Sequence, residues 1–181
     1  FLKEYKESSR LILYFHNDPL SMNGSKYKYQ RKFLLQTCSK IIFNSNWSKR
    51  RFLTDLNLSL DNDKICTINQ STKNIYINFK NKKNIITFVG KLNRSKGYDI
   101  FGNTIIKILN KHKLWSSIVI GDEPRDKLNF NHKNLFKLGF LKHEKVLNIY
   151  KKTSIAIVCS RWEEPFGRTS LEASSNGCAV I

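Results

Sequence analysis

Short apolar runs alternate with amphipathic segments along the whole chain. Runs of apolar and β-branched residues predict strands, whereas apolar residues spaced three and four positions apart predict helices. Strands are predicted at 11–15, 41–43, 65–68, 85–89, 117–121, 134–138, 154–159 and 179–181. Helices are predicted after a cap at Ser25, after a cap within 44–46 (a helix that carries Leu56), after Gly97, and over 143–151 and 167–176. This alternation predicts an α/β fold whose parallel sheets are covered on both faces.

A polar, irregular stretch at 69–84 interrupts the alternation and suits a linker. We therefore expect two Rossmann-like domains, one over residues 1–72 and one over residues 73–181. Ligands of open parallel sheets bind beyond the carboxyl ends of the strands. Candidate chemistry is therefore expected in the loops after Val89, Ile120 and Cys159.

The first candidate loop runs from Gly90 to Gly97 and ends where a helix begins. Gly90 lets the backbone approach a ligand closely, and the helix start offers free N–H groups at its positive end. Lys91, Arg94 and Lys96 then suit the neutralisation of a diphosphate. The alternative interpretation is a solvated loop in a lysine-rich protein.

The second candidate loop contains Pro165 and Gly167, which fix a tight turn before a helix. The N–H groups of residues 166–168 are then expected to face outward. Glu164 lies in the loop and Glu172 about two turns later. Two carboxylates around a helix start suit a ligand rich in hydroxyl groups, because one carboxylate accepts two hydroxyl hydrogen bonds. The alternative is a helix-dipole role for Glu164 and an ordinary surface position for Glu172.

These residues resemble a known family. EPFG at 164–167, LEA at 171–173 and GCAVI at 177–181 resemble the E-x7-E signature of family 4 glycosyltransferases. GKL at 90–92 and KG at 96–97 stand at the expected earlier positions. Linked motifs of this kind rarely occur together by chance. The resemblance implies the GT-B architecture of two Rossmann-like domains, and it is firm over 60–181.

The resemblance also implies roles for single residues. Glu164 matches the first motif glutamate, which contacts the hydroxyls of the donor sugar near the reacting centre. Glu172 matches the second, which holds the ribose, and Lys96 matches the basic residue on the diphosphate. Lys91 stands where the family usually has arginine, so a forked contact becomes a point charge. The residues expected to bind the nucleotide sugar are Gly90, Lys91, Lys96, Phe166, Gly167, Arg168 and Glu172.

The first half resembles the family less closely. FHNDP at 15–19 is similar to a histidine-containing loop of the acceptor-side domain, and FNSNWSKRRF at 43–52 is similar to the strand–helix unit that closes it. His16 is expected to join Glu164 and Lys96 as a catalytic residue. The alternative is that His16 only caps the end of a strand. Residues 1–72 would thus be acceptor-side and residues 73–181 donor-side.

The expected reaction moves a sugar from a nucleotide diphosphate to a hydroxyl with retention of configuration. The expected partners are a nucleotide sugar and a glycan or lipid-linked acceptor, in the synthesis of surface polysaccharide or glycolipid. Cations and helix dipoles would stabilise the leaving diphosphate, so neither a cofactor nor a metal is expected. Asp61-Asn62-Asp63 precedes a strand and is interpreted as a turn. The remaining histidines lack metal-ligand spacing and are expected at the surface: His112, His132 and His143.

Charge and cysteine usage refine this picture. The net charge of +18, from 32 basic and 14 acidic residues, should attract polyanions. Lysine outnumbers arginine and is scattered along the sequence, so we expect peripheral contact with an anionic membrane rather than nucleic acid. The four widely spaced cysteines fit a reducing cytoplasm and neither a zinc site nor a disulfide scaffold. The expected location is cytoplasmic, at the inner face of the membrane.

The two ends suggest a piece of a longer protein. The chain starts at Phe1 without an initiator methionine and stops at Ile181 within a predicted strand, so both domains are expected to be incomplete. One alternative is therefore an inactive glycosyltransferase fragment with residual nucleotide binding. A second alternative is a basic nucleic-acid-binding domain.

Overall fold

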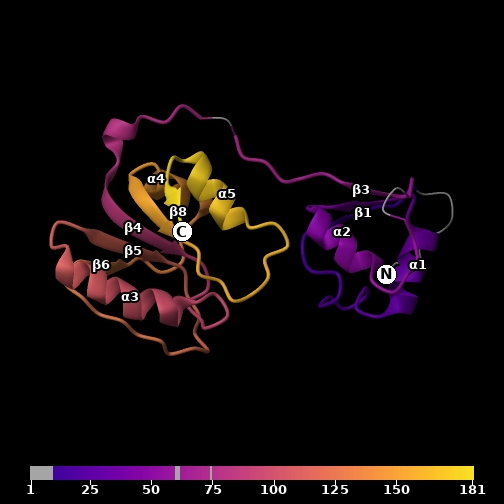
Figure 1. Ribbon diagram of the computed structural model, residues 1–181, viewed down its shortest axis with the longest axis horizontal. Coiled ribbons are helices and arrows are strands. Elements are labelled where there is room, and N and C mark those ends of the chain that lie inside the picture. The colour runs from indigo at the N-terminus through magenta and orange to yellow at the C-terminus, as the bar shows by residue number, and fades with distance from the viewer. Residues whose placement is uncertain (1–9, 60–61, 74) are drawn as a thin grey trace. The chain divides into compact units, whose positions relative to one another are not determined.

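Two compact units make up the chain in this computed structural model, which describes residues 10–59, 62–73 and 75–181 (Figure 1). The division falls between Gln70 and Ser71, and residues 164–166 group with the first unit. Each unit contains one parallel sheet. Within the described ranges, none of the helices combines the length and the apolar character needed to cross a membrane.

The first unit has a three-stranded sheet in the order β1-β2-β3, with parallel pairing throughout. Its strands are β1 Ile12–Phe15, β2 Lys40–Phe43 and β3 Ile65–Thr67, and its helices are α1 Lys28–Thr37 and α2 Asn46–Leu53. The predicted cap of α2 is confirmed, because the hydroxyl of Ser45 accepts a hydrogen bond from the N–H of Ser48.

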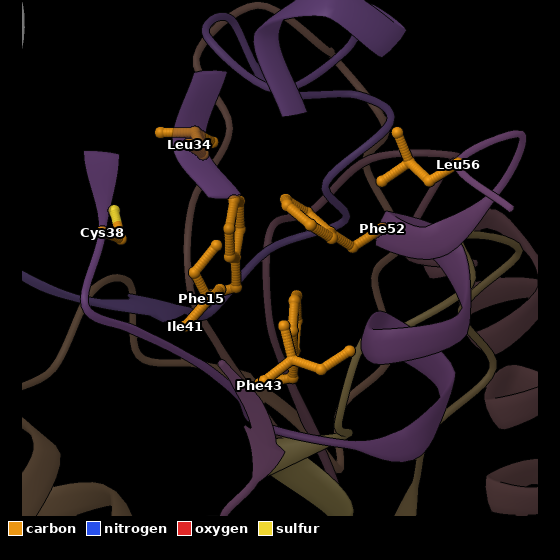
Figure 2. Close-up of a cluster of buried hydrophobic side chains, with 8 residues drawn as sticks. Phe15, Leu34, Cys38, Ile41, Phe43, Phe52 and Leu56 are labelled. Atoms are coloured by element: carbon orange, nitrogen blue, oxygen red, sulfur yellow. The ribbon is translucent and has the colours of Figure 1, made fainter. Parts of the chain in front are cut away.

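Three phenylalanines form the centre of the core of this unit (Figure 2). The rings of Phe15 and Phe43 stack with their centroids 5.4 Å apart, and Phe52 from α2 lies 5.2 Å from Phe43. Leu34 from α1 packs on the same cluster. The sheet thus buries Phe15, Ile41 and Phe43 against α1 and α2.

Three local expectations for the first unit are wrong. Ser25 does not cap α1, because its hydroxyl donates to the carbonyl of Pro19 at 2.6 Å and the helix begins at Lys28. Leu56 is buried but lies beyond the end of α2. The strand at 11–15 was expected to be buried, but Ile12 is 61% exposed, since β1 is the outer strand of the sheet in the described part of the chain.

The second unit has a five-stranded parallel sheet in the order β6-β5-β4-β7-β8. Its strands are β4 Lys83–Val89, β5 Ser116–Ile120, β6 Leu135–Lys137, β7 Thr153–Ile157 and β8 Ala179–Val180. Its α-helices are α3 Tyr98–Lys111, α4 His143–Tyr150 and α5 Arg168–Ser175. The strand order reverses between β4 and β7, so the topological switch point lies between the loops that follow these two strands.

Helices cover both faces of this sheet (Figure 1). On one face, Phe101, Ile105 and Leu109 of α3 are buried against β4 and β5. On the other face, Val146 and Tyr150 of α4 pack with Ala173 of α5 and with β7. The predicted doubly covered parallel sheet is confirmed, and its switch point positions the candidate site.

The expected linker is shorter than 69–84. A 3-10 helix, η2 (Phe79–Asn81), leads into β4, which begins at Lys83. Lys82 donates from Nζ to the carbonyls of Tyr150 at 2.9 Å, Thr153 at 2.7 Å and Asn176 at 2.6 Å. These carbonyls lie at or just beyond the ends of α4 and α5, where helices leave acceptors without an internal partner. Lys82 therefore fixes the end of the segment to the second unit, and burial lowers its pKa.

Candidate functional site

The two loops at the switch point are tied together by one arginine. Arg161, in the loop after β7, donates from Nη1 and Nη2 to the two carboxylate oxygens of Asp99 in the first turn of α3, at 2.7 and 2.8 Å. Its Nη1 also donates to the carbonyl of Arg94 at 2.5 Å, and its N–H donates to the carbonyl of Ser95 at 2.8 Å. The loop after β4 thus has a defined position against the loop after β7.

Glycines permit the close approach of backbone at this edge. Gly97 caps α3 with φ +72°, and a Cβ atom there would lie 2.0 Å from the carbonyl oxygen of Cys159. A Cβ at Gly121, directly after β5, would lie 1.9 Å from the carbonyl oxygen of Gly90. A Cβ at Gly90 would make only ordinary van der Waals contacts, the nearest at 3.9 Å to the ring of Phe88. The expected role of Gly90 in close ligand approach therefore stays a prediction.

Asn93 organises the cationic loop from inside. Its Oδ1 accepts hydrogen bonds from the N–H of Lys96 at 3.0 Å and from the hydroxyl of Ser95 at 2.9 Å. Its Nδ2 donates to Glu123 at 3.3 Å, and Glu123 pairs with Arg125 at 2.7 Å. No role was predicted for Asn93 from the sequence, although asparagine is a common turn residue because its side chain bonds to nearby backbone.

The arginines lower the pKa values of their carboxylate partners. Hydrogen bonds from Arg161 lower the pKa of Asp99 from its ordinary value of 3.8 to about 2. Hydrogen bonds from Arg125 lower the pKa of Glu123 from 4.5 to about 2. Because both pKa values fall on folding, these pairs stabilise the fold above the ordinary carboxyl range and lose that effect as pH falls toward 2. The Arg161–Asp99 ion pair, which joins the two loops, is therefore fully charged near neutral pH.

Replacing Arg161 with methionine should return the pKa of Asp99 from about 2 toward 3.8, because the bidentate hydrogen bonds are lost. The carboxyl carbon shift of Asp99, followed by NMR as pH is lowered, measures this change. Arg125→Met is the matched control, which should raise the pKa of Glu123 and leave Asp99 unchanged. Equal pKa values for Asp99 in Arg161→Met and in the unmodified protein would contradict the assigned cause.

Glu172 lies in a second polar cluster, between α4 and α5. Its Oε1 accepts from Arg168 one turn earlier at 2.9 Å and lies 3.0 Å from Nε2 of His143, the first residue of α4. The Glu172 side chain is only 13% exposed, so it is not the ordinary surface acid of the alternative interpretation. His143 is 56% exposed, and its pairing with Glu172 has no signal in the sequence because the two residues lie 29 positions apart.

The remaining motif residues lie around the start of α5. Gly167 caps the helix with φ +81°, a conformation that favours glycine, and Arg168 is the first helical residue. Phe166 is half-buried and Glu164 is exposed, both in the loop between β7 and α5. The chain bends at residues 165–166 before α5 begins, and the expected outward-facing N–H groups of residues 166–168 stay a prediction. Lys91 is exposed and Lys96 half-buried in the loop after β4.

His16 follows directly after β1 in the first unit and is exposed. Its Nδ1 lies 2.8 Å from Nε2 of Gln70, and its ring lies 4.4 Å from the ring of Tyr14. Its carbonyl accepts from Nδ2 of the buried Asn44 at 3.0 Å. When the ring is neutral and Nδ1 accepts from the Gln70 amide, Nε2 carries the proton and can donate to a ligand. The contacts of Gln70 and Asn44 with His16 were not predicted from the sequence.

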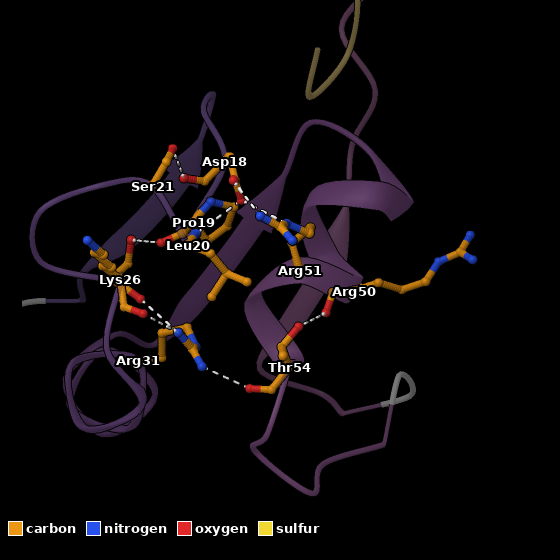
Figure 3. Close-up of polar contacts among 10 residues, drawn as sticks. Asp18, Pro19, Leu20, Ser21, Lys26, Arg31, Arg50, Arg51 and Thr54 are labelled. Carbon is orange, nitrogen blue, oxygen red and sulfur yellow. Dashed lines mark hydrogen bonds and ion pairs between the residues drawn. The ribbon is translucent and has the colours of Figure 1, made fainter. Parts of the chain in front are cut away.

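The loop after His16 is held by two arginines (Figure 3). Arg51 donates to both carboxylate oxygens of Asp18, at 3.2 and 2.8 Å. Burial would raise the pKa of Asp18, but the hydrogen bonds from Arg51 and from the N–H of Leu20 outweigh burial and lower it. The buried Arg31 donates to the carbonyls of Ser25, Lys26 and Thr54. These bonds keep the loop in one conformation beside His16.

The Asp61-Asn62-Asp63 stretch, the histidines and the cysteines show no metal site within the described part of the chain. Asp61 lies outside the described residues, whereas Asn62 forms a turn by accepting the N–H of Lys64 at 2.9 Å. Across the described ranges, no three histidine, cysteine or acidic side chains gather as metal ligands would. All four cysteines are free, and Cys38 and Cys178 are buried.

A doubly wound parallel sheet with glycines and cations at its switch point is the architecture of nucleotide-binding α/β proteins. A family model described as "Glycosyl transferases group 1" matches residues 70–181. The chain belongs to this glycosyltransferase family.

Relatives support the same family. An uncharacterized glycosyltransferase of Methanocaldococcus jannaschii is 30% identical over 112 residues, which is 58% of this chain and 28% of that protein. Spore coat protein SA of Bacillus subtilis is 28% identical over 112 residues, which is 55% of this chain and 30% of that protein. The chain matches less than a third of the length of these two curated relatives.

Solved structures share the architecture. Anabaena HepE in complex with UDP-glucose has a TM-score of 0.72 at 16% identity, covering 94% of this chain and 52% of that one. The pneumococcal O-GlcNAc transferase GtfA in complex with UDP and GlcNAc has a TM-score of 0.74 at 18% identity, covering 95% of this chain and 37% of that one. The predicted α/β class with Rossmann-like units, and its GT-B fold, are thereby confirmed.

Proposed function

We propose that this chain is part of a retaining glycosyltransferase that moves a sugar from a nucleotide diphosphate to a hydroxyl acceptor. The observation that carries the proposal is the switch point, where the cationic loop after β4 is fixed against the loop after β7 by Arg161. Family membership and one relative named as a glycosyltransferase support the reaction class. The E-x7-E pattern of Glu164 and Glu172 supports placement in family 4 with retention.

In the proposed reaction, the donor diphosphate lies between the Gly90–Gly97 loop and the start of α5. Lys91 and Lys96 neutralise its charge, and the amino end of α3 contributes its dipole. As the bond to the anomeric carbon breaks, these fixed charges stabilise the departing diphosphate without reorganisation. The proposal requires neither a metal nor another cofactor, because lysines and helix dipoles supply the positive charge.

Glutamates and neighbouring residues are proposed to orient the donor. Glu172 accepts the two ribose hydroxyls, and its pairing with Arg168 and His143 keeps its carboxylate oriented before binding. Glu164 contacts the hydroxyls of the transferred sugar. Phe166, Gly167 and Arg168 contribute N–H groups and packing at the start of α5.

The first unit is proposed to be the acceptor side. His16 contacts the transferred sugar or the acceptor through Nε2, and Gln70 holds its ring by the contact at Nδ1. The donor is proposed to be a nucleotide sugar, which is supported by the complexes of HepE with UDP-glucose and of GtfA with UDP and GlcNAc. The proposed acceptor is a glycan or a lipid-linked glycan. We propose synthesis of surface polysaccharide or glycolipid at the cytoplasmic face of the membrane as the setting.

NMR titration of the isotopically labelled protein with UDP and with GDP tests the proposed donor site. Amide shifts are expected in residues 90–97 and 167–172, because N–H groups at those loops would meet the phosphates and ribose. Shifts confined to residues 10–70 would contradict the placement.

The stereochemistry of the product tests the proposed reaction. The anomeric configuration of the transferred sugar should equal that of the donor, and an inverted product would rule out retention.

A further inference from the structure

Two lysine-bearing segments meet at the amino-terminal edge of the second unit's sheet. Lys83 begins β4, and Lys151 and Lys152 directly precede β7. The segments are joined by a hydrogen bond from the N–H of Lys83 to the carbonyl of Lys152 at 2.8 Å. They line a hollow of about 650 Å³, together with two asparagines and with Lys80 and Lys82. We call the exposed lysines 80, 83, 151 and 152 the basic edge.

The basic edge is wholly cationic. The residues lining the hollow are five lysines and two asparagines, without a carboxylate. Lys82 is bound to three carbonyls and holds the segment in place, whereas the four lysines of the basic edge are exposed. Two of these lysines lie some 70 positions from the other two in the sequence, so the fold concentrates charge that is scattered along the chain.

Exposed aromatic side chains stand just before the basic edge in the chain. Phe79, the first residue of η2, is 68% exposed and precedes Lys80. Tyr76 is 94% exposed. Aromatic rings beside lysines are typical of surfaces that enter the headgroup region of a bilayer, where the ring meets apolar chains and the ammonium groups stay in water.

We propose that the basic edge binds the anionic headgroups of a phospholipid bilayer, with Phe79 inserted at the interface. Lysine favours this partner over nucleic acid, because it is a compact point charge on a flexible stem and lacks the fork with which arginine recognises phosphates and bases. The basic edge lies at the opposite ends of β4 and β7 from the Gly90–Gly97 loop and the loop after β7, so binding leaves both loops uncovered. This surface is argued from charge and exposure alone and does not depend on the proposed transfer reaction.

Sedimentation with vesicles tests the proposal, using an equimolar mixture of phosphatidylglycerol and phosphatidylcholine beside pure phosphatidylcholine. The test variant carries Lys80→Gln, Lys83→Gln, Lys151→Gln and Lys152→Gln. The matched control carries Lys107→Gln, Lys111→Gln, Lys127→Gln and Lys133→Gln, which removes the same number of charges from exposed positions. The affinity of the test variant for the anionic vesicles should fall about tenfold or more, whereas that of the control variant should fall much less.

A third variant, Phe79→Ser, separates a bilayer from soluble phosphates. It should bind the anionic vesicles about threefold more weakly with an unchanged salt dependence, because it removes apolar insertion and no charge. Equal losses in the two lysine variants would show diffuse attraction and overturn the proposal. Unchanged vesicle binding by the test variant would also overturn the proposal, even if a parallel titration showed that this variant had lost affinity for duplex DNA. Unchanged vesicle binding by Phe79→Ser would overturn it as well. Circular dichroism checks that each variant is folded.

Discussion

Replacing Lys96 with alanine should lower kcat/KM for sugar transfer by about a hundredfold or more. This is the size of effect expected when an active site loses one preorganised group that stabilises charge in the transition state. Lys96 lies directly before the cap of α3, and the side chain of Asn93 holds its backbone N–H at 3.0 Å. Its ammonium is therefore attached to a fixed stretch of backbone beside the positive end of a helix. The leaving diphosphate gains negative charge as the glycosidic bond breaks, so the loss should appear mainly in kcat.

Lys107→Ala is the matched control, because Lys107 is an exposed lysine within α3, away from the loop after β4, and its removal changes the net charge equally. Steady-state kinetics of the whole protein with varied donor should show near-normal turnover for this control. Normal turnover in Lys96→Ala would remove Lys96 from the catalytic residues. A large loss in both variants would instead indicate that overall charge, rather than position, governs donor binding.

Local pattern was sufficient to predict most of the fold. Phe101, Ile105 and Leu109 follow the helical period, and all three are buried on one face of α3. A cap within 44–46 was likewise predicted, and Ser45 supplies it, because a polar side chain before an amphipathic run satisfies an N–H of the first turn. Such features depend on residues a few positions apart, so they can be inferred without knowing how the chain folds back.

Expectations failed where a distant residue decided the outcome. Ser25 looked like a helix cap, but the buried Arg31 takes its carbonyl and the hydroxyl turns to Pro19 instead. The end of the expected linker is ordered because Lys82 reaches carbonyls more than 60 positions away. A lysine in a polar stretch is normally predicted to be exposed to solvent. The three carbonyl groups that bind the ammonium of Lys82 come together only in the folded structure.

The candidate site shows the same division. The loops after β4 and β7 were predicted from strand ends and glycines, because the carboxyl ends of parallel strands share one edge. The partners that fix these loops were not predicted, since Arg161 binds Asp99 across 62 positions and His143 meets Glu172 across 29. Ion pairs between residues far apart in the chain follow no period, so a single sequence carries no signal for them.

Gly97→Ala should destabilise the second unit by about 2–5 kcal/mol, because the added Cβ atom meets backbone and the residue keeps a left-handed conformation. A Cβ atom would lie 2.0 Å from the carbonyl oxygen of Cys159, so backbone on both sides must move. Such overpacking costs about 1–3 kcal/mol. The left-handed conformation at φ +72° adds about 1–2 kcal/mol for any residue with a Cβ. Urea unfolding measures the sum.

Gly139→Ala separates the two contributions. Gly139 has φ +65°, almost the same conformation as Gly97, but no atom lies within 4 Å of its Cβ position. It should therefore cost only the conformational part, about 1–2 kcal/mol. The difference between the two variants isolates the contact between the loop after β4 and Cys159. Equal losses would mean that the contact relaxes freely and that the two loops are not held together at Gly97. A larger loss for Gly97→Ala, accompanied by weaker UDP binding, would connect this backbone contact to the donor site.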